Sequence, residues 1–357
     1  MAQYKYTLQE DYSFAGGIPE PPFTIHKSMQ GKLDPKYVEF FNTNLAHNSN
    51  LMATHRVPLQ DIRASGNVIP GQSPLADVKE TFDIEIPRVH TSGPPIPARV
   101  FVPNGNPPAG GFPLFIWYHG GGWVLGGIST ENSYCTNAAE LAQCVVVTVD
   151  YRLAPEDPFP ACVDDAYEAA IWGLASAPTI LGINGTKVAV GGSSAGGNLT
   201  AIVTNKYASS PLAQTLPPLA FQVQVVPVTD NTATAETQPS WGENEFTAQL
   251  PAEKMLWYRR LYLPNPEDAG KPESSPLFYS DESMAKVPPC FIAASECDIL
   301  RSEAEAYAAK LKKNGVDTTI VIYKGMPHTT MVMDAVMDQG RQLVADTTGA
   351  LKKAFYG

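Results

Sequence analysis

The fold of this chain is decided by the stretch Val188-Ala189-Val190-Gly191-Gly192-Ser193-Ser194-Ala195-Gly196-Gly197-Asn198-Leu199. The apolar run at 187–190 predicts a buried strand, and residues 198–203 have the periodicity of a helix. Between them, Gly192 to Gly196 matches the pattern G-x-S-x-G. In a strand–turn–helix setting this pattern is typical of a nucleophile elbow, a tight turn that exposes a serine hydroxyl. Ser194 is therefore the candidate nucleophile.

Length and composition describe an acidic globular protein. The chain has 357 residues, of which 44% are hydrophobic and 17% charged, and this is enough to bury a sizeable core. A formal net charge of −11 argues against nucleic acid and anionic membrane surfaces as partners. Five irregularly spaced cysteines predict buried thiols rather than a zinc site. The sequence has neither a long apolar run nor an apolar N-terminal segment, so it predicts a soluble cytoplasmic protein without membrane insertion.

Strands and helices alternate from about residue 80 onward. Strands are expected at 81–89, 96–102, 113–118, 144–149, 187–190, 221–226, 289–294 and 318–323. Helices are expected at 35–47, 131–143, 160–175, 198–203, 252–262, 302–313 and 333–355. This alternation predicts an α/β fold, a mostly parallel sheet with helices on both faces. The last strand is a candidate edge for pairing with a second copy, which leaves a homodimer open.

Two aromatic-rich stretches fall outside this rhythm, at 1–50 and 229–270. We expect them to form a helical cap on a single domain whose core comprises 80–228 and 271–357. Their aromatic rings either contact an apolar substrate or pack on one another. A narrow pocket under a cap favours short- to medium-chain acyl groups, because each further buried CH₂ gains about 0.8 kcal/mol only while room remains.

The candidate base and acid both follow strands. In open α/β sheets ligands bind beyond the carboxyl ends of the strands, where residues from different strands converge. Of six histidines, only His119 and His328 directly follow expected strands. His328 comes after the last strand and completes the chain order Ser, Asp, His. Asp298 is favoured as the acid that orients the imidazole, and Glu296 is the alternative.

A glycine run after the strand at 113–118 supplies candidate donors for an oxyanion. Glycines at 120, 121 and 122 let the backbone approach a substrate. The N–H groups of Gly121, Gly122 and Ala195 can then converge on one oxygen. His119 has a possible catalytic role, but a ring that braces Gly120 and its neighbours is favoured. No G-x-G-x-x-G follows a strand, so a dinucleotide site is not expected, and neither a cofactor nor a metal is predicted.

Together these motifs resemble the hormone-sensitive-lipase-like branch of the α/β-hydrolases. The resemblance covers about 80–357 and rests on His119 to Trp123, Asp150 to Glu156, Phe159 to Ala161, Gly192 to Leu199, Ser275 to Leu277, Asp298 with Leu300 and Arg301, and His328. It implies an α/β-hydrolase fold with a cap. It also implies a serine carboxylesterase that acts on small-molecule esters through an acyl-enzyme and needs no cofactor.

The chain departs from that family at two positions. Members usually have an acid before the nucleophile, where this chain has Ser193, and often glycine after the histidine, where it has Thr329. Ser193 thereby removes a negative charge from the turn. Alternative activities are acyl transfer, elimination as in the family's dehydratases, and ligand binding as in its hormone receptors. The dehydratases replace the serine and the receptors lack the histidine, so Ser194 and His328 favour hydrolysis.

Overall fold

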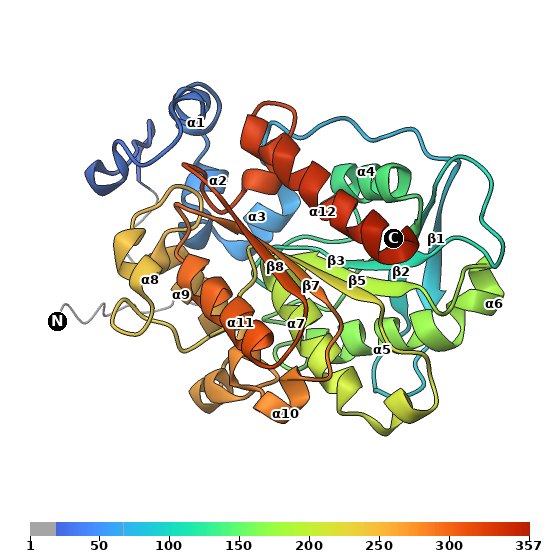
Figure 1. Ribbon diagram of the computed structural model, residues 1–357. Helices are drawn as coiled ribbons and strands as arrows, with labels where there is room; N and C mark the ends of the chain where they lie inside the picture. The colour runs from blue at the N-terminus through green and yellow to red at the C-terminus, as the bar shows by residue number, and fades with distance from the viewer. Residues whose placement is uncertain (1–18, 67) are drawn as a thin grey trace.

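A computed structural model describes residues 19–66 and 68–357 of the protein. Its central sheet has the order β1-β2-β4-β3-β5-β6-β7-β8 (Figure 1). The strands are β1 (Glu80–Ile86), β2 (Ile96–Val102), β3 (Leu114–Tyr118), β4 (Val145–Val149), β5 (Val188–Ser193), β6 (Phe221–Val225), β7 (Cys290–Ser295) and β8 (Thr318–Tyr323). β2 runs antiparallel to both β1 and β4, and the remaining pairs are parallel. The predicted α/β-hydrolase fold is confirmed.

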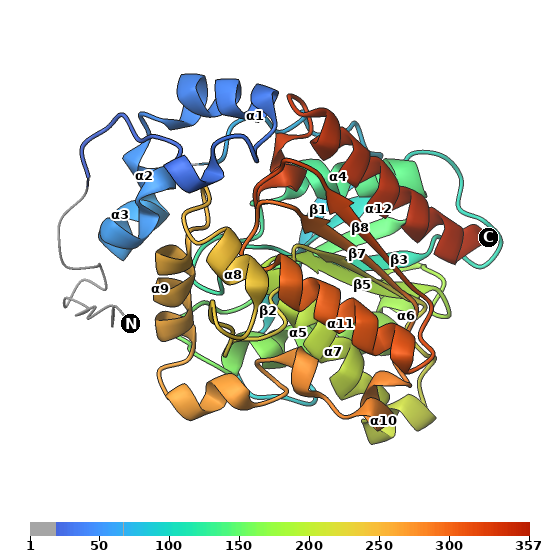
Figure 2. The same ribbon diagram turned by 60° about the vertical axis from the view of Figure 1, so that its left-hand side comes forward.

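Helices cover both faces of the sheet. One face carries α4 (Asn132–Ala142) and α12 (Asp338–Tyr356), and the other carries α5 (Ala161–Ala175), α7 (Ala195–Ala208) and α11 (Arg301–Lys313) (Figures 1 and 2). Side chains alternate between the two faces, so Trp117 packs with α4 while Ile116 and Tyr118 pack with α5. Every residue of β3 and β4 is buried, as their continuous apolar sequences predict.

Shorter helical elements lie around this core. They are η1 (Lys27–Met29), α1 (Pro35–Phe40), η2 (Phe41–Leu45), α2 (Ser49–Met52), η3 (Thr54–Arg56), α3 (Leu59–Ala64), α6 (Ala177–Leu181), η4 (Pro211–Gln214), α8 (Pro239–Glu243), α9 (Ala252–Tyr262), η5 (Pro266–Gly270), η6 (Pro276–Phe278), α10 (Asp281–Met284) and η7 (Thr330–Met333). None of the helices in the described part of the chain is both long and apolar enough to cross a membrane.

Several expected boundaries were wrong. The strand expected at 81–89 ends at Ile86, and the strand expected at 187–190 continues to Ser193. The helix expected at 35–47 continues beyond Phe40 as the π-helical turn η2. The last helix begins at Asp338 rather than 333, because residues 330–333 form η7 and the Asp334 carboxylate accepts a hydrogen bond from Ser73 N at 2.8 Å. The helix expected at 198–203 begins at Ala195, so Ser194 alone separates β5 from α7.

Two segments far apart in the sequence lie side by side beyond the carboxyl ends of the strands. α2 and α3 come from the N-terminal part of the chain, and α8 and α9 follow β6 (Figure 2). Arg56 donates to Glu253 Oε1 at 2.7 Å, which joins η3 to α9. Residues 1–18 of the predicted cap lie outside the described residues. The division into cap and core stays a prediction.

A buried carboxylate joins α5 to loops at the edge of the sheet. Asp165 is only 1% exposed. Its Oδ1 accepts hydrogen bonds from Arg88 Nη2 and, at 2.7 Å, from Arg152 Nη2. Its Oδ2 accepts one from the Arg152 backbone N–H at 2.8 Å. The motif residue Arg152 is therefore held by α5.

Removing this charge should destabilise the fold. We expect Asp165→Asn to lower the free energy of unfolding by about 3–5 kcal/mol, because it leaves the buried guanidinium group of Arg88 without its ion-pair partner. Asp83→Asn is the matched control, since Asp83 pairs with Arg99 but its side chain is 56% exposed. The control should cost less than about 1 kcal/mol. Urea denaturation measures both, and equal losses would contradict the expectation.

Candidate active site

The turn at Ser194 holds the candidate nucleophile. Ser194 has φ 52° and ψ −114°, a backbone conformation that non-glycine residues rarely adopt. A Cβ at position 192 would lie 2.3 Å from the carbonyl carbon of Gly196, and a Cβ at position 196 would lie 1.8 Å from the Tyr118 carbonyl oxygen. Both positions therefore require glycine. The turn raises the serine hydroxyl above the carboxyl edge of the sheet.

The three residues predicted to form a catalytic triad are in contact. Ser194 Oγ lies 2.8 Å from His328 Nε2, and His328 Nδ1 lies 2.6 Å from Asp298 Oδ2. Asp298 is 1% exposed and also accepts a hydrogen bond from Leu300 N at 3.1 Å. The alternative acid, Glu296, instead accepts hydrogen bonds from Lys324 Nζ and Gly325 N, each at 2.8 Å. Asp298 thus contacts the imidazole and Glu296 does not.

The predicted oxyanion donors are available. Among the described residues, the N–H groups of Gly121, Gly122 and Ala195 have no protein acceptor. Ala195 is the first residue of α7, where backbone N–H groups lack an intrahelical partner. The reason for the glycines differs from the one argued from sequence. A Cβ at 121 would lie 2.1 Å from the Leu125 carbonyl oxygen, and one at 122 would lie 2.3 Å from the Tyr258 ring. The loop's own turn and its contact with α9 therefore require glycine.

His119 contacts the backbone of the candidate oxyanion loop, residues 120–122. Its ring is buried and stacks on Tyr151, with centroids 4.2 Å apart. His119 Nδ1 lies 2.7 Å from the Gly120 carbonyl oxygen, and the Tyr151 hydroxyl donates to the His119 carbonyl at 2.8 Å. Burial lowers the pKa of His119 to about 4, so the ring is neutral at physiological pH. It lies outside the chain of hydrogen bonds from Ser194 to Asp298.

A buried carboxyl group that sequence reasoning missed lies against the elbow. Glu131 Oε1 accepts hydrogen bonds from Ser193 Oγ at 2.5 Å and from Gly120 N at 3.3 Å. Its Oε2 accepts one from Trp117 Nε1 at 2.6 Å. Burial raises the pKa of Glu131, and the hydrogen bonds from Ser193 and Trp117 oppose that shift. An acidic group is therefore present beside Ser193 after all, supplied by another segment. The sequence marked Glu131 only as the start of a helix.

The second family departure, Thr329, has a partner in the predicted cap. Its hydroxyl donates a hydrogen bond to Oε1 of Gln249, a residue that lies between α8 and α9. Gln249 has a positive φ of 71° and is largely buried. The residue after His328 thus connects the histidine loop to the segment that covers it.

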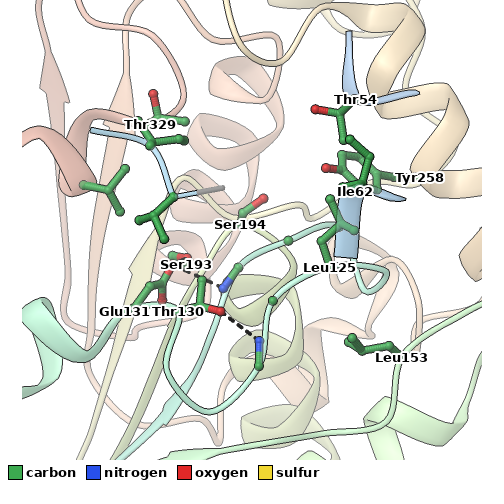
Figure 3. A pocket seen from close by; sticks show the side chains of 18 of the residues that line it. Thr54, Ile62, Leu125, Thr130, Glu131, Leu153, Ser193, Ser194, Tyr258 and Thr329 are labelled. Atoms are coloured by element: carbon green, nitrogen blue, oxygen red, sulfur yellow. Dashed lines mark hydrogen bonds between the residues drawn. The ribbon is translucent and has the colours of Figure 1, made fainter. Parts of the chain in front are cut away.

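Ser194 and His328 open into a pocket of about 1030 Å³. Figure 3 shows Thr54, Ile62, Leu125 and Tyr258 on one side of this pocket and Thr329 on the other, with Ser194 between them. Sites for small ligands range from about 300 to 1,000 Å³. The volume of this pocket therefore lies at the upper end of that range. Among the described residues, no three His, Cys, Asp or Glu side chains gather as a metal site.

Comparison with known proteins shows the family to which the chain belongs. The family described as "alpha/beta hydrolase fold" matches residues 115–332. The chain belongs to this family, in its hormone-sensitive-lipase-like carboxylesterase branch.

Relatives of this α/β-hydrolase match most of its length. An AB hydrolase superfamily protein of Schizosaccharomyces pombe is 55% identical over 332 residues, which are 93% of this chain and 96% of the relative. The ethyl acetate hydrolase of Pseudomonas putida is 31% identical and covers 81% of this chain and 87% of its own. The crystal structure of the carboxylesterase EstE1, cloned from a metagenomic library, has a TM-score of 0.72 and 36% identity, covering 79% and 91%.

The contacts of Glu131 predict a loss of turnover when its charge is removed. In the wild type the donors around Glu131 share two carboxylate oxygens, whereas the amide of Glu131→Gln offers only one oxygen. A donor near Gly120 therefore loses its acceptor, and the loop at residues 120–122 shifts. A hydrogen bond to a charged group is worth about 1.5–3 kcal/mol, so kcat for p-nitrophenyl butyrate should fall on the order of 10- to 100-fold with KM little changed.

Glu140→Gln is the matched control for Glu131→Gln. Glu140 lies on α4, the helix that begins directly after Glu131, and accepts a hydrogen bond from Asn104 N near the surface. Its replacement should leave kcat unchanged. A folded Glu131→Gln protein with wild-type kcat would mean that the carboxylate does not position the loop.

Proposed function

We propose that this α/β-hydrolase is a serine carboxylesterase that hydrolyses small and medium-chain carboxylic esters through an acyl-enzyme. The observation that carries the proposal is the continuous chain from Ser194 Oγ through the His328 ring to Asp298, with distances of 2.8 and 2.6 Å. A serine hydroxyl needs such an adjacent base to act as a nucleophile at neutral pH. The names of the relatives, among them an ethyl acetate hydrolase and an arylesterase, support ester substrates.

In the proposed reaction His328 Nε2 takes the proton of Ser194 Oγ while the oxygen attacks the ester carbonyl carbon. The electron pair of the broken C–O π bond moves onto the carbonyl oxygen. The N–H groups of Gly121, Gly122 and Ala195 hold that oxyanion, which is usually the largest electrostatic contribution to such a reaction. Asp298 keeps the imidazole in the required tautomer and stabilises the imidazolium.

Collapse of the tetrahedral intermediate breaks the bond to the alcohol, which leaves with the proton held by His328. Water then enters, gives a proton to His328 and attacks the acyl-enzyme carbonyl. The second collapse returns the proton to Ser194 and releases the acid. This sequence uses only protein side chains, backbone donors and water.

We further propose a cytoplasmic location and self-association through β8. All five cysteines are free and buried, which suits a reducing compartment. β8 stands at the end of the strand order and has an unpaired edge for a second copy.

The central test is the nucleophile. Ser194→Ala should lower kcat by on the order of 10⁶, since triad serines elsewhere cost that much when removed. Ser193→Ala, one residue away, should keep most activity because its hydroxyl only donates to Glu131. Hydrolysis of p-nitrophenyl butyrate and labelling by a small fluorophosphonate measure both proteins. Loss of labelling in Ser193→Ala, with Ser194→Ala still active, would show that the nucleophile is misassigned.

The pocket predicts a preference for acyl length. We expect kcat/KM for p-nitrophenyl esters to peak between C2 and C8 because each added CH₂ contributes about 0.8 kcal/mol only while it is buried. A series from C2 to C16 measures the position of the peak. A steady increase to C16 with activation at a lipid interface would instead indicate a lipase.

A further inference from the structure

A lysine lines the cap side of the pocket without an acidic partner. Lys254 lies on α9, is 7% exposed, and belongs to the wall of the same pocket as Ser194 and His328. Its Nζ donates one hydrogen bond, to the Leu51 carbonyl oxygen at 3.0 Å. An ammonium group has three N–H donors. The Leu51 carbonyl therefore accounts for only one of them.

The neighbouring charges belong to a separate ion-pair group. Glu253 accepts a hydrogen bond from Arg56 at 2.7 Å and lies 3.5 Å from His55 Nε2. None of the salt bridges among the described residues includes Lys254. Burial lowers the pKa of Lys254 to about 7, and no counter-charge opposes that shift. A buried cation without a counter-charge is costly, so its position on a pocket wall suits an anion from outside the protein.

Lys254 is close enough to the reaction centre to contact a bound ester. It lies four residues before Tyr258, and residues so spaced share one face of a helix, about 6 Å apart along the axis. Tyr258 packs directly against Gly122 of the oxyanion loop. Lys254 thus lies on the same wall of the pocket as Tyr258, about one helical turn away from the ring that contacts Gly122.

We propose that the pocket takes esters whose far end carries a carboxylate, which pairs with the ammonium of Lys254. This inference rests on the proposed ester hydrolysis and names its substrate class. The ester carbonyl sits at Ser194, a chain of methylenes fills the pocket, and the terminal carboxylate supplies the missing counter-charge. Lys254 is a specificity-determining residue and takes no part in bond breaking.

Matched substrates test this proposal. Monoethyl esters of dicarboxylic acids from succinate to suberate place the acid on the acyl side, and acetates of ω-hydroxy acids place it on the alcohol side. Each acid is compared with its primary amide, which keeps the length but not the charge. At pH 6.5 we expect kcat/KM to favour the acid at least 10-fold in one of the two series, at one preferred length.

Substitution of Lys254 should remove this preference. In Lys254→Met the ratio of kcat/KM for acid over amide should fall to about one or below, because only the acid substrate pairs with the ammonium group. Lys312→Met is the matched control, because Lys312 is exposed on α11. The control should keep the wild-type ratio.

The pH dependence supplies a test that needs no variant. The ratio of kcat/KM for acid over amide cancels the protonation of His328, which both substrates share. Lys254 is charged below a pKa of about 7 in the free protein, so the ratio should fall as the pH rises through that value. The other titratable groups near Lys254 are His55 and Arg56 on η3 and Glu253 on α9. The falling ratio should disappear in Lys254→Met and persist in His55→Gln.

Two results would overturn the proposal. One is an acid-to-amide ratio near one in both series for the wild type. The other is a preference for the acid that survives in folded Lys254→Met. Absence of hydrolysis of every ester, including ethyl butyrate, would instead contradict the proposed function, so the two failures are distinguishable.

Discussion

The backbone turn at Ser194 is the constraint on which the rest of the site depends. A serine at positive φ costs energy, and it persists because residues 192 and 196 lack side chains that would collide with neighbouring backbone. The same turn ends β5, starts α7 and leaves the Ala195 N–H without an acceptor. One local conformation therefore presents the hydroxyl and leaves the Ala195 N–H available as the proposed oxyanion donor.

Buried polar groups hold the candidate oxyanion loop, residues 120–122, in addition to the turn that its own glycines permit. Glu131 contacts Gly120 and Ser193, so it connects the loop to the elbow. On the other side, the stacked rings of His119 and Tyr151 support the backbone of the loop. Donors that stabilise a developing charge must be oriented before the reaction, because reorganisation during it would cost energy. These contacts provide that orientation.

The residues proposed to perform the chemistry and those proposed to select substrates come from different parts of the chain. Ser194, Asp298 and His328 follow core strands, whereas Tyr258, Lys254 and Gln249 come from the segment after β6. Gln249 nevertheless contacts Thr329, the residue after His328, and Tyr258 contacts Gly122. A change in the predicted cap can therefore alter both the shape of the pocket and the position of the catalytic loops.

The sequence by itself determined the succession of strands and helices along the chain and the residues that follow the strands. Parallel strands bring their carboxyl ends to one edge, so a serine, an acid and a histidine that follow such strands must converge. That rule located Ser194 and His328, but it left Asp298 and Glu296, two residues apart, as alternatives. Only the tertiary structure separated them, by turning Asp298 to the imidazole and Glu296 to Lys324. Glu131 and Ser193 are 62 positions apart, and Lys254 and Leu51 are 203 apart. Periodicity records which face of an element is buried, but not which distant polar group meets it there, so these contacts were decided by packing alone.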